Sequence, residues 1–371
     1  MSPAHRLRRR LLRLAGRVRP PRAAPAQPRS VLIIRPDHLG DAILAAPAVA
    51  ALRAAFPHAQ LTGWVGPAVQ PVWRYVPALD ALEVCDFPGF ARRPKRSPLA
   101  PYALAVREAA RLHGRFDLAV NLRADFWWGA MVACWAGIPV LGCHTPECEP
   151  FLAVAMPYTP GLHETKQSLR LVRRITNGVI GADDAIRWPA LALPAGLPKG
   201  AVVLHVGSGA LVKLWDEARW AQLAAALAAA GLAVVLNAGG AEELAAAERI
   251  RAQMHQPAPI VAGLSLEELA AFYGRSCLVI AADNGPLHLA RSVSTPTVGL
   301  FGPTDPAQFG PGPQPNPLHE VVRLPWPCSP CGRLDYTPAE LAYHLCVKLI
   351  EPDRVLEAAR RVLAARAERP S

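Results

Sequence analysis

The most constraining feature of the sequence is a segment in which two strands, a turn and a helix follow one another closely. Residues 277–282 form an apolar run that fits a buried strand, and the run ends at a turn over residues 283–286. Residues 287–293 continue at helical spacing, and residues 298–301 provide a second strand that ends at loop 302–306. A helix that begins directly after a strand leaves backbone N–H groups and its positive dipole end at the sheet edge. The segment therefore predicts a phosphate-binding turn in an open α/β sheet.

The same alternation of short apolar runs and helical stretches recurs along the whole chain. The predicted strands cover residues 31–34, 61–65, 81–84, 118–122, 140–142, 201–206 and 233–236, with helices between them. This alternation predicts parallel, doubly wound sheets. We expect two Rossmann-like α/β domains, one formed by residues 31–187 and one by residues 201–350, joined by the Pro/Gly-rich linker 188–200. A helix at about 163–180 closes the first half, and a last helix within residues 351–371 is expected to pack back on the N-terminal domain.

The net charge of +11 is concentrated at the N-terminus. Residues 1–30 hold nine Arg and no acidic residue, and removing these nine charges leaves only +2 for the rest of the chain. A body so close to neutral argues against a nucleic acid as partner.

Residues 1–30 also contain an apolar helical face. Leu7, Leu11, Leu14 or Ala15, and Val18 fall on one side of a helix, with Arg around the rest. This pattern is typical of a short helix that lies on an anionic membrane surface, and a disordered, solvated tail is the alternative. The apolar stretches of the chain are too short or too interrupted to cross a bilayer. We expect a monomeric cytoplasmic protein that is peripheral on the cytoplasmic face of a bacterial inner membrane.

The eight cysteines do not form a disulfide framework. Cys328 and Cys331 form a C-x-x-C pair, and Cys346 follows fifteen residues later. A zinc site would need a fourth ligand, for which His344 is the nearest candidate. We expect reduced structural thiols and no metal site, with a local disulfide as the second choice.

Polar residues follow the first predicted strand. Arg35, Asp37 and Asp41 lie between strand 31–34 and the helix that follows it. A carboxylate in this position either serves the chemistry of a bound ligand or caps and complements the helix. Asp37 is the alternative carboxylate to Asp41.

A second group of polar residues follows strands of the second half. Ser208 and Gly209 come after strand 201–206, and Lys213 precedes the next helix, where it either neutralises a diphosphate or is an ordinary surface lysine. Glu242 and Glu243 follow strand 233–236, where an acid can accept hydrogen bonds from a ribose.

The order and spacing of these motifs resemble glycosyltransferase family 9, the ADP-heptose:lipopolysaccharide heptosyltransferase family. The matching segments are Val31-Leu32-Ile33-Ile34-Arg35 with Leu39-Gly40-Asp41, then Lys213-x-Trp215, and finally Asp283-Asn284-Gly285-Pro286-Leu287-His288-Leu289-Ala290 with Phe301-Gly302-Pro303-Thr304-Asp305-Pro306. The resemblance implies the GT-B arrangement, in which two Rossmann-like domains face each other across a cleft. It implies inverting, metal-independent transfer of heptose from ADP-heptose onto a lipid-linked lipopolysaccharide core glycan, with no other cofactor. The sequence contains no Asp-x-Asp pair.

The resemblance also implies roles for individual residues. Asp41 would be the general base, and Lys213 would stabilise the leaving diphosphate together with the backbone of Ser208 and Gly209 and the helix start at Asn284 and Gly285. Glu242 would contact the ribose, with Glu243 as second choice, while Asp283 and His288 would shape the donor pocket. Arg35 and Asp37 would lie on the acceptor side.

Departures from the family pattern leave the identity of the sugar open. Family members often carry Ser or Thr just before the Gly-Asp pair, where this chain has Asp37 and His38, and a Ser or Thr after Asp283, where this chain has Asn284. The Cys-bearing region also lacks one of the cysteines usual in the family. The alternatives are a nucleotide-sugar-modifying, epimerase-like enzyme on the same fold and a catalytically silent protein docked on a membrane.

Overall fold

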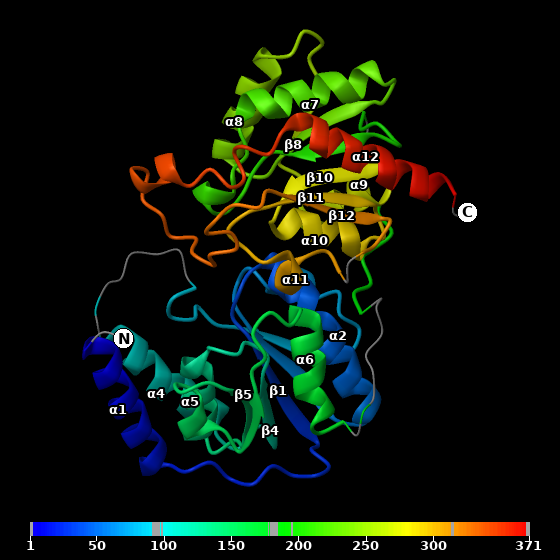
Figure 1. Ribbon diagram of the computed structural model, residues 1–371. Helices are drawn as coiled ribbons and strands as arrows, with labels where there is room; N and C mark the ends of the chain where they lie inside the picture. The colour runs from blue at the N-terminus through cyan, green and yellow to red at the C-terminus, as the bar shows by residue number, and fades with distance from the viewer. Residues whose placement is uncertain are drawn as a thin grey trace. The chain divides into compact units, whose positions relative to one another are not determined.

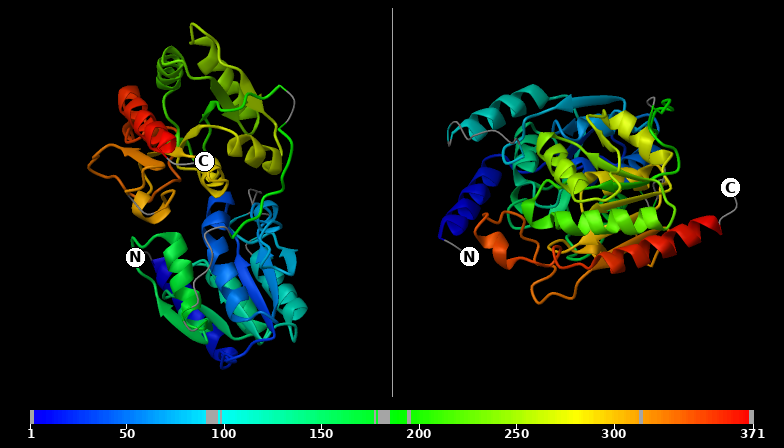
Figure 2. Two further views of the ribbon diagram at one scale, coloured as in Figure 1. Left: turned by 90° about the vertical axis from the view of Figure 1, so that its right-hand side faces the viewer. Right: turned by 90° about the horizontal axis from the view of Figure 1, so that it is seen from above.

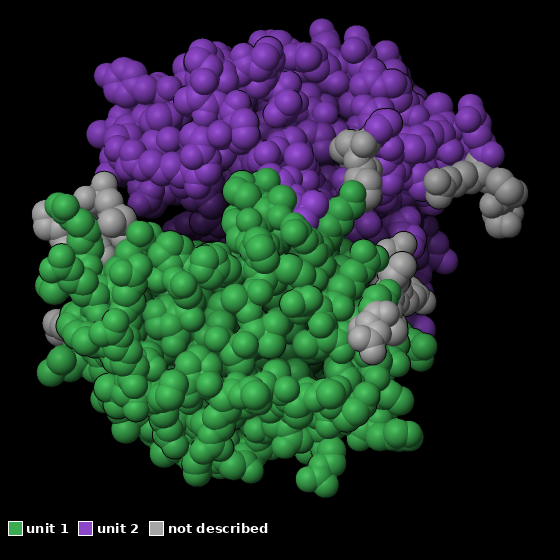
Figure 3. All heavy atoms as spheres, turned by 60° about the horizontal axis from the view of Figure 1, so that its bottom comes forward, with its two compact units in different colours: residues 1–160, 164–187 green, residues 161–163, 188–371 purple. Residues whose placement is uncertain are grey.

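The computed structural model describes residues 3–90, 97, 99–176, 178, 185–193, 196–312 and 315–368. The chain divides into two compact units (Figure 3). Unit 1 comprises residues 1–160 and 164–187, and unit 2 comprises residues 161–163 and 188–371. Both units are α/β domains with a six-stranded parallel sheet (Figure 1), which confirms the predicted fold class.

Unit 1 is built around strands whose side chains are buried on both faces. Residues 31–34 of β1 have no exposed surface, as expected of a central strand in a parallel sheet covered by helices on both sides. The sheet order is β3-β2-β1-β4-β5-β6. Its strands are β1 (Ser30–Arg35), β2 (Gln60–Val65), β3 (Ala81–Val84), β4 (Leu118–Asn121), β5 (Val140–His144) and β6 (Val154–Pro157). Its helices are α1 (Pro3–Val18), α2 (Leu39–Ala55), α3 (Gln70–Trp73), α4 (Ala100–Leu112), α5 (Trp127–Trp135), the 3-10 turn η1 (Glu149–Phe151) and α6 (Glu164–Arg173).

Unit 2 repeats the same plan. Its sheet order is β12-β11-β10-β7-β8-β9, from strands β7 (Val202–His205), β8 (Val234–Ala238), β9 (Ile260–Ala262), β10 (Leu278–Ala282), β11 (Thr297–Phe301) and β12 (His319–Arg323). Its helices are η2 (Leu211–Lys213), α7 (Glu217–Ala229), α8 (Ala241–Ala252), α9 (Leu266–Gly274), α10 (Gly285–Ser292), α11 (Pro306–Phe309), η3 (Glu340–Tyr343) and α12 (Pro352–Ala367).

Both sheets reverse their winding direction between two neighbouring parallel strands. In unit 1 the chain starts at β1, moves outward through β2 and β3, and returns to pair β4 with β1. In unit 2 the corresponding neighbours are β7 and β10. In doubly wound sheets, ligands bind outside the carboxyl ends of the strands at this switch point. We therefore expect ligands to bind at the loops after β1, β4, β7 and β10.

The C-terminal helix completes the core of unit 2. Val355, Ala359 and Val362 of α12 are fully buried and belong to the same apolar core as Trp215 and Trp220. The helix packs against α7 and against strands β10, β11 and β12 (Figures 1 and 2). The expectation that this helix packs back on the N-terminal domain is therefore wrong, because its apolar face covers the sheet of unit 2.

The N-terminal basic segment is not a disordered tail in the part that the structure describes. It forms helix α1, which packs against η1 within unit 1. Leu12 is 5% exposed and belongs to the core of this unit. A Cβ on Gly16 would lie 2.5 Å from the carbonyl oxygen of Pro150, so the helix approaches η1 more closely than a larger residue would allow. The disordered alternative is thus wrong for residues 3–18.

The sequence did not predict strands β6, β9 and β12, each of which lies towards the end of a sheet. Helix α6 ends at Arg173, short of the predicted 180, and residues 177 and 179–184 lie outside the described residues. Residues 194 and 195 of the predicted linker also lie outside them. Among the helices that the structure describes, none combines the length and apolarity needed to cross a bilayer.

Candidate active site

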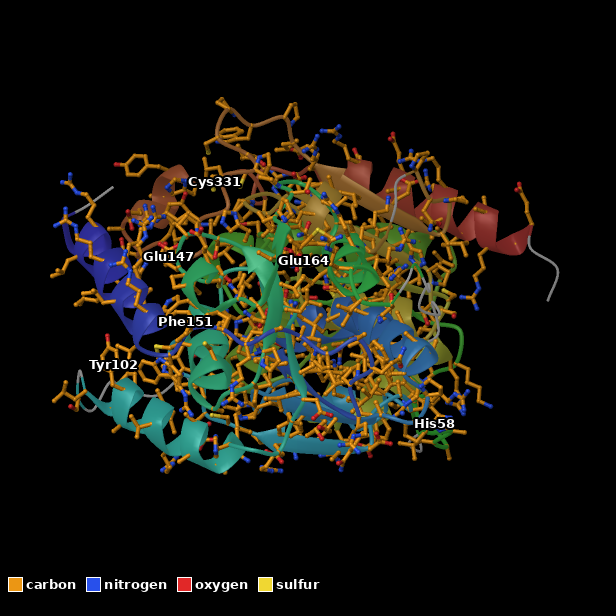
Figure 4. All side chains as sticks on the ribbon, turned by 90° about the horizontal axis from the view of Figure 1, so that it is seen from below. His58, Tyr102, Glu147, Phe151, Glu164 and Cys331 are labelled. Atoms are coloured by element: carbon orange, nitrogen blue, oxygen red, sulfur yellow. The ribbon has the colours of Figure 1, made fainter. Side chains whose placement is uncertain are left out.

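In unit 1 the buried guanidinium of Arg35, at the end of β1, gathers three carboxylates. Its Nη2 lies 2.8 Å from Oδ2 of Asp37, 3.5 Å from Oδ1 of Asp41 and 3.8 Å from Oε2 of Glu164. Asp41 comes from the first turn of α2, and Glu164 from the start of α6, which packs beside α2. Figure 4 labels Glu164. The structure thus brings Arg35, Asp37 and Asp41 together at the carboxyl end of β1.

Asp37 is held between two arginines and has no exposed side-chain surface. Its Oδ2 pairs with Arg35 at 2.8 Å and accepts a hydrogen bond from Nη1 of Arg123 at 2.9 Å. Burial raises the pKa of Asp37, and the charges of Arg35 and Arg123 oppose that rise. Arg35 and Asp37 lie in unit 1, where they were expected on the acceptor side, but both side chains are buried and pair with each other. Their role towards an acceptor stays a prediction.

Asp41 is the accessible carboxylate of this group. Its side chain is 23% exposed, whereas those of Arg35 and Asp37 are at most 2% exposed. The N-cap of α2 is His38, whose side chain makes no capping hydrogen bond, and Asp41 lies within the first turn. Its charge complements the helix dipole there, but Asp41 is not the cap residue. Of the structural alternative, the capping role is therefore not supported by the local geometry, and the role of complementing the helix dipole remains.

Sequence reasoning missed Arg123 and Glu164. Arg123 follows β4, the neighbour of β1 across the switch point, so the strand order of the fold is the signal that points to it. Glu164 had no comparable signal in the sequence. Nearby, Nε of Arg35, Oδ1 of Asp37 and Oδ1 of Asn121 are buried without a hydrogen-bond partner within the described protein. Such atoms mark this edge as a polar region suited to bound water or ligand hydroxyls.

In unit 2 the carboxylate of Asp283, directly after β10, is the centre of the corresponding cluster. Nζ of Lys213 donates to its Oδ2 at 2.7 Å and to its backbone oxygen at 3.2 Å. The hydroxyl of Thr304, in the loop after β11, donates to Oδ2 at 2.5 Å, and Nε2 of His288 lies 3.8 Å from Oδ1. Lys213 is therefore a paired lysine at the switch point and not an ordinary surface lysine.

The neighbours of Asp283 keep it ionised despite its burial. Burial alone would raise its pKa, but His288 and the positive charge of Lys213 outweigh burial and lower the pKa to about 2. A fixed negative charge at this position holds the ammonium group of Lys213 in place at neutral pH. Thr304 belongs to the loop 302–306 noted in the sequence, although its contact with Asp283 was not predicted.

The start of α10 follows Asp283 directly. Asn284 is the N-cap residue, its Oδ1 accepts a hydrogen bond from the backbone N–H of Leu287, and its Nδ2 donates to the backbone oxygen of Gly207. Pro286 has no N–H to offer. Asn284 thus links the loop after β7 to the start of α10 across the switch point. Its own side chain accepts the N–H of Leu287, so that N–H is not available to a ligand.

The loop after β7 brings Ser208 and Gly209 to the same edge. Oγ of Ser208 accepts a hydrogen bond from the N–H of Ala210 at 3.4 Å, and η2 then carries Lys213 towards Asp283. The structure therefore brings Ser208, Gly209, Lys213, Asp283 and Asn284 together within unit 2, as the sequence motifs predict for the carboxyl edge of one sheet.

The two neighbouring glutamates after β8 differ sharply. Glu242 is exposed at the start of α8, whereas the carboxylate of Glu243 accepts a hydrogen bond from the N–H of Gly239 at 2.7 Å. A Cβ on Gly207 would lie 1.9 Å from the carboxyl carbon of Glu243, so the loop after β7 needs a glycine at this point. Oε2 of Glu243 also lies 3.6 Å from Nε2 of His205.

A buried network of polar side chains lies beside Glu243 and contacts it through His205. Nδ1 of His205 and the hydroxyl of Tyr273 both lie 2.8 Å from Oδ1 of Asn237. Burial lowers the pKa of His205, which favours the neutral imidazole. The geometry therefore makes Glu243, the second choice from the sequence, the glutamate that is fixed at the carboxyl edge.

The cysteines are all free thiols, so the local disulfide considered from the sequence is wrong. Cys328 and Cys331 are exposed, Cys346 is buried, and Sγ of Cys331 lies 3.5 Å from the hydroxyl of Tyr336. Within the described residues, no group of three or more His, Cys, Asp or Glu side chains is arranged to hold a metal ion.

Known proteins with similar sequences and folds are glycosyltransferases. The model of glycosyltransferase family 9 (heptosyltransferase) matches residues 178–337. Lipopolysaccharide heptosyltransferase 1 of Pseudomonas aeruginosa is 27% identical over an alignment that covers 90% of this chain and 98% of that protein. The crystal structure of a family 9 glycosyltransferase from Veillonella parvula superposes with a TM-score of 0.68 at 22% identity, covering 91% of this chain and 97% of that one. A heptosyltransferase of E. coli, solved with ADP, superposes with a TM-score of 0.66 at 18% identity, and the superposition covers 90% of this chain and 99% of that one.

The structural likenesses extend over both units and agree with the sequence matches. Together with the motifs at the carboxyl edges of the two sheets, they show that the chain is a glycosyltransferase that is similar to glycosyltransferase family 9.

Proposed function

We propose that the protein is an inverting, metal-independent glycosyltransferase that moves heptose from ADP-heptose onto the core of lipopolysaccharide. The observation that carries this proposal is the paired cluster of Lys213, Asp283 and Thr304 at the switch point of unit 2, in a chain whose unit 1 presents an accessible carboxylate, Asp41, at its own switch point. The sugar and the acceptor come from the names of the relatives, among them lipopolysaccharide heptosyltransferase 1 and a heptosyltransferase solved with ADP.

On the donor side, the diphosphate leaving group needs positive charge. Lys213 supplies an ammonium group whose position Asp283 fixes, and the loop at Ser208 and Gly209 contributes backbone N–H groups beside it. These groups are oriented before the donor binds, so they need little reorganisation as charge develops on the diphosphate. The sequence lacks an Asp-x-Asp pair, and Lys213 takes the role that a divalent ion would otherwise have.

An acid after β8 contacts the ribose of the nucleotide in this proposal. Glu242 was the first choice from the sequence, but its side chain is exposed, whereas Glu243 is fixed by the N–H of Gly239. We therefore assign the ribose contact to Glu243. His288, at 3.8 Å from Asp283, orients that carboxylate against Lys213.

On the acceptor side, Asp41 is the general base. A sugar hydroxyl is a poor nucleophile unless its proton is removed as the new bond forms. Asp41 takes that proton while the hydroxyl oxygen bonds to the anomeric carbon and the bond from that carbon to the diphosphate breaks, so that ADP leaves. Displacement from the face opposite the leaving group inverts the configuration. Arg35, which Asp37 holds in place, pairs with Asp41 at the start of α2.

The acceptor is a glycan linked to a lipid, which sets where the enzyme works. We propose that it acts as a monomer on the cytoplasmic face of the inner membrane, and that residues 1–30 attract it to the anionic surface through their nine Arg. No metal or organic cofactor is required besides the donor.

The experiment that tests this proposal is a transfer assay with a panel of nucleotide sugars, run with and without a lipopolysaccharide acceptor. ADP-heptose should raise the melting temperature of the protein most, and ADP should form only when the acceptor is present. An epimerase-like enzyme would convert the donor without an acceptor, and a silent binding protein would release no ADP in either arm. Either result would contradict the proposal.

A further inference from the structure

We propose that the outward faces of α1 and α4 form one surface on unit 1, and that this surface docks on an anionic phospholipid bilayer. The inference deepens the membrane-linked function proposed above, on which it rests for the lipid-linked acceptor. It differs from an N-terminal tail that binds lipid, because part of the surface comes from α4, far along the chain.

Helix α1 carries two apolar faces. Leu12 and Gly16 point into unit 1 and are buried. On the opposite side of the helix, four large side chains are between 55% and 85% exposed: Leu7, Leu11, Leu14 and Val18. Their spacing of four, three and four residues puts them on one line along the helix. The inner face alone therefore attaches α1 to the protein, and the outer face has no partner within the described residues of the chain.

A row of arginines runs beside this apolar line. Each apolar residue is preceded by an arginine, so Arg6, Arg10, Arg13 and Arg17 repeat at the same spacing, about 100° around the helix. On the flank nearer the protein, Arg9 pairs with Glu147 at 2.7 Å. Helix α1 itself contains no acidic residue. An apolar line with cations beside it matches a bilayer whose headgroups are negative.

Helix α4 also has one buried apolar face and one exposed apolar face. Ala105, Ala109 and Leu112 pack into the core of unit 1. Leu99, just before the helix, and Tyr102 and Val106 within it are 72%, 52% and 62% exposed on the adjoining face. The one acid of α4, Glu108, is buried and pairs with Arg111 at 2.8 Å. The outer face of α4 is therefore apolar and free of exposed carboxylates.

The C-terminal ends of the two helices line one groove. A groove of about 640 Å³ is lined at the end of α1 by Val18 and Arg19, at the end of α4 by Val106, Ala109, Ala110 and His113, and by Trp135 of α5. Figure 4 shows α1 and the start of α4, marked by Tyr102, at the same side of unit 1, with Glu147 near α1. Seven of the twelve large apolar side chains that are exposed among the described residues belong to these two helices and the residue before α4. Exposed apolar side chains that gather around a groove in this way indicate an interaction site.

Vesicle sedimentation with the full chain tests the inference. The parent protein should bind vesicles of phosphatidylglycerol and phosphatidylethanolamine, and should bind vesicles of phosphatidylcholine at least tenfold more weakly. The double variant Tyr102→Ser/Val106→Ser should lose at least tenfold in binding to the anionic vesicles, because two exposed apolar groups no longer enter the interface. Arg10→Gln/Arg13→Gln should lose a similar factor and reduce the salt dependence.

The matched control is Leu211→Ser/Tyr343→Ser, which removes two exposed apolar side chains from unit 2 and should bind like the parent. Equal melting temperatures show that the variants remain folded. Parental binding by the α4 variant would overturn the proposal, since α1 alone would then account for the lipid affinity. The proposal would also be overturned if the parent protein formed concentration-dependent dimers and the α4 variant stayed monomeric. The surface would then bind a second copy of the chain. Vesicle binding needs no sugar transfer, so its outcome is independent of whether the proposed reaction occurs.

Discussion

Asp37 and Asp41 lie four residues apart, yet their surroundings suit them to different tasks. Asp37 is enclosed by Arg35 and Arg123, and replacing it would leave two buried or half-buried cations without their shared partner. Asp41 keeps an exposed edge and contacts Arg35 only at 3.5 Å. A substitution at Asp37 therefore tests the stability of unit 1, whereas a substitution at Asp41 tests the chemistry.

Lys213 is the residue on which donor binding should depend most. We expect Lys213→Ala to weaken the binding of ADP by about ten- to a hundredfold, because a hydrogen bond to a charged group contributes about 1.5–3 kcal/mol. Calorimetric titration with ADP measures the change. Lys213→Arg should recover part of the affinity, and Lys199→Ala, which removes an exposed lysine of the same unit, should leave it unchanged. If the Lys213→Ala protein has a lower melting temperature but binds ADP as tightly as the parent, then Lys213 only pairs with Asp283 and does not bind the donor.

Asp283 should stabilise the protein in a pH-dependent manner. Its pKa is lowered from 3.8 to about 2, so the folded state favours the ionised form more than the unfolded state does. The stabilisation is therefore complete above about pH 4 and is lost as the pH falls towards 2. Nearly two pKa units correspond to about 2 kcal/mol.

Urea unfolding of the parent and of Asp283→Asn checks this expectation. The difference in unfolding free energy between the two proteins should be largest near neutral pH and should narrow between pH 4 and pH 2. A difference that stays constant over this range would show that the charge of Asp283 is not what stabilises the fold.

At the scale of elements, α12 shows what a sequence pattern contains and what it lacks. The sequence predicted a last helix within residues 351–371, and the structure has this helix at Pro352–Ala367. The helix has an apolar face, but an apolar face in a sequence does not specify which sheet it covers. That choice depends on the path of residues 324–351, which contain little regular structure. The packing partner of α12 was therefore predicted wrongly.

The short strands at the sheet ends were missed for a related reason. β9 has three residues and β12 mixes apolar and charged residues, so neither forms the continuous apolar run that marks a buried strand. The central strands β1, β7 and β10 were predicted because they are buried on both faces. Since the candidate site lies at the ends of these central strands, most of its residues could also be predicted.

Side-chain contacts in the site could not be predicted. Glu242 and Glu243 are equivalent in sequence, and only the turn at Gly239 decides which carboxylate is fixed. Likewise, the burial of Asp37 depends on Arg123, which is 86 residues away along the chain.

The assignment of α12 to unit 2 predicts the effect of a core substitution. Val362→Asp places an unpaired charge in the core of unit 2 and should cost about 3 kcal/mol or more. Hydrogen exchange should accelerate in β10, β11, β12 and α7, which α12 covers, and stay unchanged in the sheet of unit 1. Arg360→Asp, at an exposed position of the same helix, is the control. Faster hydrogen exchange in the sheet of unit 1 instead would support the expectation from the sequence that α12 packs on the N-terminal domain.

At the scale of the whole molecule, two sheets of the same strand order carry complementary chemistry. Unit 2 presents a cation held by a carboxylate, which suits a diphosphate, and unit 1 presents an accessible carboxylate, which suits a hydroxyl proton. The basic segment and α4 add a surface of a third kind, apolar and cationic. A transferase that joins a nucleotide sugar to a lipid-linked glycan needs each of these three surfaces.

The central claim is that Asp41 is the base of the transfer. The most direct measurement is the single-turnover rate of sugar transfer from ADP-heptose to a lipopolysaccharide acceptor by Asp41→Asn, with ADP affinity and melting temperature measured in parallel. Asn keeps the size of Asp but cannot accept the proton, so we expect the rate to fall by about a hundredfold or more while affinity and melting temperature change little. Glu164→Gln, which neutralises another carboxylate near Arg35, should slow transfer less. Near-parental transfer by Asp41→Asn, or a collapse of its melting temperature, would contradict this account of the enzyme.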